Sequence, residues 1–275
     1  MERTHPSDGV DLAAAAAVIE PLLVEAGALT LRWFRAPVRI DDKGGARGYD
    51  PVTEADRAVE TLLRTGLTAR FPGHAITGEE HGTSGPVDAR VRWIIDPIDG
   101  TRAFVSGIPE WGILVGLVVD GQPAAGWAHI PYLGETFAAV GGQGWFERQG
   151  TRRALRTRPT TDLGAATLFC THPATFITPA SRAAFDRLAA RVRLQRYGGD
   201  CYSYCLLALG HIDLVVESSL QAYDIVPLMP IIAAAGGVVT SPTGQPPLDG
   251  GTVIAAATPE LHAQAMAVFN DASAC

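Results

Sequence analysis

Two aspartates three residues apart follow an apolar run in the segment WIIDPIDGTRAF at 93–104. Pro97 fixes the backbone between Asp96 and Asp99, so we expect both carboxylates to converge on one point. Neighbouring carboxylates repel each other unless a cation lies between them, and oxygen ligands favour Mg²⁺, Mn²⁺ or Ca²⁺ over zinc. The segment therefore predicts a site for a hard divalent cation.

The next two residues provide a means of holding an anion beside this cation. Gly100 allows a ligand to approach the backbone closely, and Thr101 supplies a hydroxyl group. A helix that begins at Thr101 would direct free N–H groups toward the same point. A cation beside an anion site is what metal-assisted phosphate chemistry requires. An isolated D-x-x-D pair also caps helices, so the spacing alone leaves that structural alternative open.

The elements that must position these residues differ between the two halves of the chain. In the first half, helices are expected from 12 to about 34 and from 53 to 70, and strands at 75–77, 91–95, 112–119, 124–130 and 135–140. In the second half, strands are expected at 166–170, 192–196, 213–217, 237–240 and 252–256, alternating with helices at 180–190, 201–209, 225–235 and 259–269. The pattern predicts an α+β half over 1–150 and an α/β half over 151–275.

Composition restricts the partners and the cellular location. The 275 residues include 29 acidic and 22 basic side chains, a net charge of −7, which argues against nucleic-acid binding. The Ala-rich stretch at 12–19 follows acidic residues and is interrupted by Glu20, so we expect a first helix, with no signal peptide and no membrane span. The cysteines Cys170, Cys201, Cys205 and Cys275 show neither disulfide nor zinc spacing, which predicts a cytoplasmic protein.

Four segments in order carry a resemblance to a known family. WIIDPIDGTRAF strongly resembles the first signature of the inositol monophosphatase superfamily of Mg²⁺-dependent phosphomonoesterases. The other matching segments are DPVTEADRAVE at 50–60, GEE at 78–80, and ESSLQAYD at 217–224 followed by AGG at 235–237. The resemblance covers nearly the whole chain. It implies the layered αβαβα sandwich of the inositol monophosphatase and fructose-1,6-bisphosphatase type, and a homodimer.

The resemblance also implies a role for each residue of the site. The implied metal ligands are Glu79, Asp96, Asp99, Asp224 and the carbonyl of Ile98. Thr101 with Asp56 would activate the attacking water, with Glu79 counted among the catalytic residues, and the backbone N–H groups of Gly100 and Thr101 would hold the phosphate. The expected cofactor is Mg²⁺, with Mn²⁺ as a substitute. Thr53 and Asp56 also have the spacing of a capping box, and Asp224 could cap the helix that it begins.

The substrate is predicted from departures within the family pattern. Inositol phosphatases commonly read DPIDGTTNF, whereas Arg102 and Ala103 follow the threonine here. The segment RYGGDCYSYC at 196–205 resembles the histidinol-phosphate phosphatase branch, as does GTRAF followed by WGILVGL. Histidinol phosphate carries an ammonium group and an imidazole, and Asp200 with Glu217 could face them. Arg102 and Arg196 either touch the phosphate or brace acidic neighbours.

The leading hypothesis is therefore a Mg²⁺-dependent phosphatase that converts histidinol phosphate to histidinol and phosphate in histidine biosynthesis. One alternative is a phosphatase of inositol 1-phosphate, or of sugar and nucleotide phosphates, from the same superfamily. A hypothesis of another class is a catalytically silent relative that binds phosphate as a regulator. The intact acidic set argues against the silent relative, because a descendant without activity has no need of all these residues.

Overall fold

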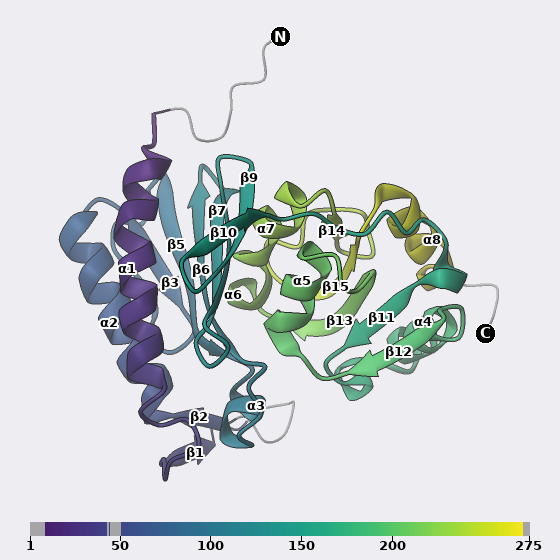
Figure 1. The fold of residues 1–275 in the computed structure, drawn as a ribbon, viewed down its shortest axis with the longest axis horizontal. Helices are drawn as coiled ribbons and strands as arrows, with labels where there is room; N and C mark the ends of the chain where they lie inside the picture. Colours follow the sequence, from purple (N-terminus) through teal and green to yellow (C-terminus); the bar gives the residue numbers. More distant parts are fainter. Residues whose placement is uncertain (1–8, 43, 45–50, 272–275) are drawn as a thin grey trace.

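Two β-sheets alternate with three layers of helices, as Figure 1 shows from its left side to its right side. The structure is a computed structural model that describes residues 9–42, 44 and 51–271. Asp50, the first residue of one motif, and Cys275 lie outside the described residues. The order of layers is helix, sheet, helix, sheet, helix, which confirms the predicted αβαβα sandwich.

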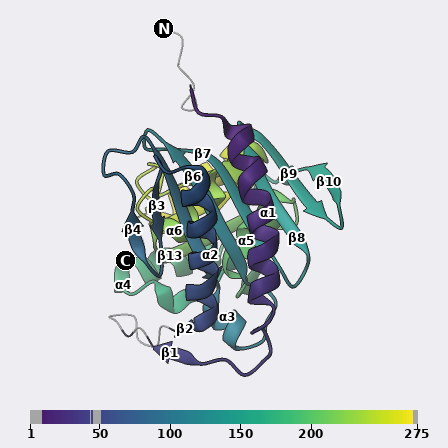
Figure 2. The ribbon, with the colours of Figure 1, turned by 90° about the vertical axis from the view of Figure 1, so that its left-hand side faces the viewer.

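The outer layer of the first half consists of α1 (Leu12–Thr30) and α2 (Glu54–Arg70), which lie side by side on the first sheet (Figure 2). Ile19, Leu23 and Ala26 recur on one stripe of α1 and pack into the cluster that holds Trp93 and Trp127 of the sheet. By length and composition α1 is apolar enough to cross a membrane. In this fold the apolar stripe of α1 instead packs on the first sheet, and α1 lies where the first helix was predicted.

The first sheet has eight strands in the order β10-β9-β8-β7-β6-β5-β3-β4, parallel between β3 and β5 and otherwise antiparallel. Its strands are β3 (Ala75–Gly78), β4 (Gly82–Ser84), β5 (Val91–Asp99), β6 (Gly112–Val119), β7 (Gln122–Ile130), β8 (Glu135–Val140), β9 (Gln143–Arg148) and β10 (Thr151–Ala154). A separate pair consists of β1 (Ile40–Asp42) and β2 (Pro51–Thr53).

The first sheet extends past residue 150, where the sequence pattern placed the division between the halves. Gln149 and Gly150 both have positive φ, 52° and 73°, which is the backbone of a tight hairpin turn. This turn returns the chain along β9, so that Thr151 pairs with Arg148. Residues 151–154, which the sequence pattern assigned to the second half, therefore form an edge strand of the first sheet.

The second sheet has five strands in the order β12-β11-β13-β15-β14. Its strands are β11 (Thr167–Cys170), β12 (Leu194–Tyr197), β13 (Leu214–Leu220), β14 (Val238–Thr240) and β15 (Gly251–Ala256). Its helices are α4 (Pro179–Ala189) and α8 (Pro259–Phe269) on the outside, and α5 (Asp200–Ala208), α6 (Ala222–Ile225) and α7 (Leu228–Ala234) in the middle layer. Short 3₁₀ turns lie at Leu163–Ala165 and Pro173–Thr175. One helix was expected over 225–235, but the chain forms α6 and α7 because Pro227 lies between them.

The middle layer fits against the first sheet because two strands carry glycine where Pro227 approaches. A Cβ atom at Gly126 would lie 1.9 Å from the carbonyl oxygen of Pro227, and one at Gly116 would lie 3.2 Å from its Cα. Both contacts involve backbone, which has little freedom to move away. The glycines of β6 and β7 therefore set how closely α6 and α7 approach the sheet.

We expect Gly126→Ala to destabilise the protein by about 1–3 kcal/mol, because the added methyl group overlaps the Pro227 carbonyl. Urea unfolding of the variant measures this loss. Gly73→Ala is the matched control, since a Cβ atom there meets nothing within 4 Å. Equal unfolding midpoints for the two variants would show that the close contact is not needed.

His129 of β7 gives the folded protein a dependence on pH. Its Nδ1 lies 2.9 Å from the Thr136 hydroxyl, and burial lowers the pKa of His129 to about 4. The folded state therefore holds a neutral ring, whereas the unfolded chain takes up a proton near pH 6.5. The resulting stability is complete above pH 6.5 and is lost as the pH falls toward 4.

We expect the free energy of unfolding of the wild type to fall more steeply between pH 7 and pH 4 than that of His129→Gln. The difference should reach about 3 kcal/mol once the pH is below both pKa values. Urea titrations of both proteins across this range measure it. Parallel curves would mean that His129 does not titrate differently in the folded and unfolded states.

Candidate active site

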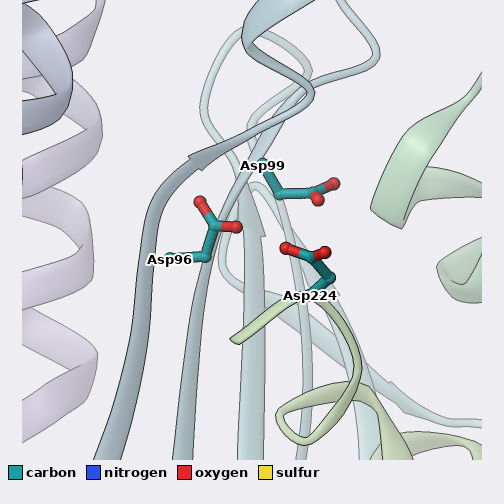
Figure 3. A group of neighbouring side chains, drawn as sticks. All are labelled: Asp96, Asp99 and Asp224. Atoms are coloured by element: carbon teal, nitrogen blue, oxygen red, sulfur yellow. The ribbon is translucent and has the colours of Figure 1, made fainter. Parts of the chain in front are cut away.

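Three aspartates point toward one another at the boundary between the two halves (Figure 3). Asp96 and Asp99 come from the end of β5, and Asp224 comes from α6. One carboxylate oxygen of each lies within 4.8 Å of one from each of the others. The structure thus brings together two residues that are three positions apart and a third that is far away in sequence.

A bulge at the end of β5 directs the first two carboxylates. Asp96 pairs with Leu114 and Asp99 with Gly112, so β5 contains one more residue than β6 between these pairs. The carboxylate of Asp96 accepts the N–H of Ile98 at 3.1 Å. The strand was expected to end at residue 95, and it continues because the bulge retains the pairing with β6. Gly100 follows with φ 84° as the N-cap of α3 (Thr101–Val105), so a helix does begin at Thr101.

Helix starts in the second half orient Asp224 and also hold Asp99. Asp99 accepts the backbone N–H of Cys201, the second residue of α5, at 2.7 Å. Asp224 accepts the N–H of Gln221 at 2.7 Å and so also caps its own helix. Gln221 is therefore the N-cap and Asp224 the third residue of the capping box, while the role of Asp224 as a metal ligand stays a prediction.

Crowding and burial oppose ionisation of these groups. Burial raises the pKa of Asp96 well above its usual value, and the charges of Glu79, Asp99 and Asp224 raise it further. Burial likewise raises the pKa of Asp99, with Asp200 and Asp224 adding to the effect. A divalent cation among these oxygens would offset the repulsion, and this set of oxygen donors suits a hard cation.

Glu79 follows β3 directly and lines the same pocket, although it is not one of the three carboxylates in closest contact. Its N–H donates to the carbonyl oxygen of Ile95 at 3.2 Å, which places Glu79 beside the end of β5. After burial, the charge of Glu79 is the largest cause of the raised pKa of Asp96. The predicted ligand therefore lies next to the group.

Thr101 and Asp56 form the pair predicted for water activation. The Thr101 hydroxyl lies 3.4 Å from Asp56 Oδ1 and 3.0 Å from the carbonyl oxygen of Ile98. The other oxygen of Asp56 accepts the N–H of Thr53 at 2.8 Å, which completes the predicted capping box. Burial raises the pKa of Asp56 to about 6, with the charge of Glu80 adding to it.

Thr101, Glu79 and the three aspartates line a cavity of about 550 Å³ between the two halves. Arg102, Asp200 and Glu217 line it as well. Arg196 is exposed on the edge strand β12 and is not among the described residues that line the cavity. The structure therefore does not bring Arg196 to the site, because β12 is an edge strand of the second sheet and all four of its residues are exposed.

Asp200 stands at the start of α5 in an unusual backbone conformation. Its φ is 41°, and it follows Gly198 and Gly199, which have φ of 92° and 103°. Burial raises the pKa of Asp200 to about 7, the charges of Glu217 and Glu110 act in the same direction, and that of Arg102 acts against them. A left-handed aspartate in a cavity wall is a strained arrangement of the kind that marks functional positions.

Glu217 is 4% exposed and already has protein partners on both oxygens. One oxygen accepts the N–H of Thr171 at 2.9 Å and, by a shorter bond, its hydroxyl group. The other accepts the hydroxyl group of Tyr204 at 3.1 Å. Glu217 therefore adds negative charge to the cavity while two fixed neighbours hold its carboxylate.

Sequence reasoning missed several of the groups that shape this site. Thr171, Tyr204 and the N–H of Cys201 act through contacts between segments far apart in sequence, which no local motif encodes. Glu110, whose charge reaches Asp200, and Glu60, discussed below, were also missed. The Glu at the end of DPVTEADRAVE was the one available signal for Glu60. The remaining cavity lining not predicted is His172, Ala174, Thr175, Ile177, Ser218, Ser219, Leu220, Gln221 and Tyr223.

The sequence profile of the inositol monophosphatase family matches residues 11–274. The chain belongs to the inositol monophosphatase family. Its members are phosphatases, so this protein is a phosphoric monoester hydrolase of a metal-dependent family that acts on small phosphate esters.

Individual family members are similar over most of the chain. A chloroplastic bifunctional phosphatase of Arabidopsis thaliana is 35% identical over 91% of this chain and 73% of its own. A histidinol-phosphatase of Mycobacterium tuberculosis is 37% identical over 82% of this chain and 86% of its own. The solved structure of an inositol monophosphatase from Zymomonas mobilis is 36% identical, with a TM-score of 0.80 over 97% of this chain and 99% of its own.

Proposed function

We propose that this phosphatase hydrolyses histidinol phosphate to histidinol and phosphate, with Mg²⁺ as the cofactor and Mn²⁺ as a substitute. The observation that carries the proposal is the placement of Asp200 in the cavity wall beside the predicted metal ligands. A carboxylate there suits a substrate with a cationic group next to its phosphate. The similarity to a histidinol-phosphatase supports the same choice.

The predicted ligands in the proposed site are Glu79, Asp96, Asp99, Asp224 and the Ile98 carbonyl. A bound divalent cation would supply positive charge for the phosphate oxygens and lower the pKa of the attacking water. The protein's own contribution to proton transfer comes from Thr101, whose hydroxyl lies between the carbonyl of Ile98 and Asp56. Asp56 can receive a proton through this hydroxyl, because its Oδ1 faces Thr101 and its Oδ2 is held by Thr53.

The anion side of the proposed site is the turn into α3. The positive φ of Gly100 lets the backbone turn toward the cavity, and a side chain there would come within 3.1 Å of Asp200. The N–H groups of Gly100 and Thr101 are proposed to hold the phosphate. Arg102 lines the same cavity and can balance the charge of Asp200 or contact the phosphate. Arg196, exposed on β12, is not part of this proposal.

The second candidate is the hydrolysis of inositol 1-phosphate or of other sugar and nucleotide phosphates, supported by the likeness to the Zymomonas mobilis inositol monophosphatase. Side-by-side values of kcat/KM for histidinol phosphate and inositol 1-phosphate, each with and without Mg²⁺, distinguish the two. We expect preference for histidinol phosphate. Preference for the inositol ester would overturn the proposal, and release of phosphate from no ester would favour the silent regulator.

The homodimer, the cytoplasmic location and the role in histidine biosynthesis stay predictions from the sequence.

The described cysteines Cys170, Cys201 and Cys205 are all free and buried. Burial raises the pKa of each thiol, so none of the three has the ionised form that a nucleophile needs.

A further inference from the structure

A fully buried carboxylate lies beneath the predicted site and has no part in the chemistry proposed above. Glu60 belongs to α2 and is 0% exposed. A buried charge of this kind costs several kcal/mol unless its partners compensate it. The partners of Glu60 therefore indicate what the carboxylate is for.

Among the described residues, the side chain of Glu60 accepts hydrogen bonds from two places, the turn between β3 and β4 and one arginine. Oε2 accepts the N–H of Glu80 at 2.7 Å, and Oε1 accepts the N–H of His81 at 3.1 Å. Oε1 also accepts a hydrogen bond from the Nε–H of Arg64, one helical turn further along α2, at 2.7 Å. Both backbone donors belong to the two residues that immediately follow Glu79.

Arg64 continues the same brace to the far side of the turn. Its guanidinium donates to the hydroxyl of Ser84 at 2.7 Å and, by a shorter bond, to the carbonyl of Gly82. The pair of Glu60 and Arg64 thus holds the turn by its N–H groups on one side and by acceptors of β4 on the other.

The end of β3 is shaped to accept this carboxylate. A Cβ atom at Gly78 would lie 2.3 Å from Oε1 of Glu60 and 2.9 Å from its Oε2. Glycine at 78 therefore leaves the space that Glu60 fills. The N–H of Glu79 meanwhile donates to Ile95 of β5. The backbone of Glu79 is consequently held on one side by β5 and on the other by the carboxylate beneath the turn.

We propose that Glu60 is a positioning residue that aims Glu79 at the three aspartates and so sets the affinity of the site for divalent cations. The inference rests on the proposed role of Glu79 as a metal ligand. Groups that orient ligands typically contribute 10–100-fold to metal affinity. Glu60 acts through the backbone of the residues after Glu79. Its carboxylate accepts two successive N–H groups and so restricts the conformation of the turn.

The test measures Mn²⁺ binding by isothermal titration calorimetry in the absence of any substrate. We expect Glu60→Gln to weaken Mn²⁺ binding by about tenfold or more. The NH₂ group of glutamine is a donor, so it cannot accept the backbone N–H that one carboxylate oxygen of Glu60 accepts. Glu25→Gln is the matched control, an identical change on the exposed face of α1. Amide exchange of Glu80 and His81 should accelerate in Glu60→Gln alone.

Gly78→Ala provides a second approach that leaves Glu60 in place. Its methyl group pushes the carboxylate away from the turn, and we expect the same loss of Mn²⁺ affinity. For both variants, kcat at saturating Mg²⁺ should return toward the wild-type value while the Mg²⁺ concentration needed for half activity rises. A general loss of structure would instead lower kcat at every metal concentration.

Glu79→Gln, measured in parallel, separates this inference from the assignment on which it rests. If Glu79→Gln weakens Mn²⁺ binding and the Glu60 and Gly78 variants do not, Glu60 has no positioning role. If Glu79→Gln itself leaves Mn²⁺ affinity unchanged, the ligand assignment is wrong and the inference falls with it. Neither outcome depends on which phosphate ester is the substrate.

Discussion

Asp96→Asn is expected to abolish divalent-cation-dependent phosphate release while the protein remains folded. Asp96 lies among the crowded carboxylates, and the substitution removes a proposed ligand and one negative charge. Since outer partners of ligands already contribute 10–100-fold, we expect cation affinity to fall by at least about 100-fold. Mn²⁺ titration and phosphate release as a function of Mg²⁺ concentration measure the effect.

The same variant should be at least as stable as the wild type when no divalent cation is added. Asparagine retains the oxygen that accepts the Ile98 N–H, and it is neutral where burial and neighbouring charges oppose ionisation. Mg²⁺ should raise the melting temperature of the wild type, because it binds the folded state, and should leave that of the variant unchanged. Asp88→Asn, an exposed change, is the control. Near-normal activity of Asp96→Asn would refute the assignment of the metal site.

Asp200→Asn is expected to reverse or greatly reduce the preference for histidinol phosphate. Loss of one partner of a buried charge pair costs about 2 kcal/mol or more, which corresponds to about 30-fold in kcat/KM. Inositol 1-phosphate has no cationic group, so its kcat/KM should not fall with the histidinol ester. The ratio of the two kcat/KM values is the measurement, because it cancels any shared effect on the metal site beside Asp200.

Asp186→Asn is the control for this comparison, since Asp186 lies on the outer helix α4 and pairs with Arg182. A fall of the same size for both substrates would assign Asp200 to the support of Asp99 and the cation instead of substrate recognition. An unchanged ratio with normal turnover would remove Asp200 from the site altogether.

Local patterns were sufficient to predict most of the fold. The Ala-rich stretch that begins α1 and the capping box of Thr53 and Asp56 both act over a few residues. Such signals predicted the helices and strands, and the resemblance to the inositol monophosphatase superfamily implied the layers that they form. Two errors fall where pairing between strands decides the outcome, namely the bulge that extends β5 and the edge strand β10. The break between α6 and α7 instead follows from a local feature, Pro227.

Sequence alone determined the acidic residues that could hold a cation. The spacing of Asp96 and Asp99 is local, and the resemblance, which covers nearly the whole chain, implied Glu79 and Asp224. The convergence of Asp96 and Asp99 follows from one short turn, and the structure places Asp224 beside them. Only the tertiary structure decided which other charges belong to the site. It placed Asp200 in the cavity wall, turned Arg196 to solvent and put Glu60 beneath Glu79. Those outcomes depend on how sheets and helices pack, since packing brings together groups that no spacing along the chain relates.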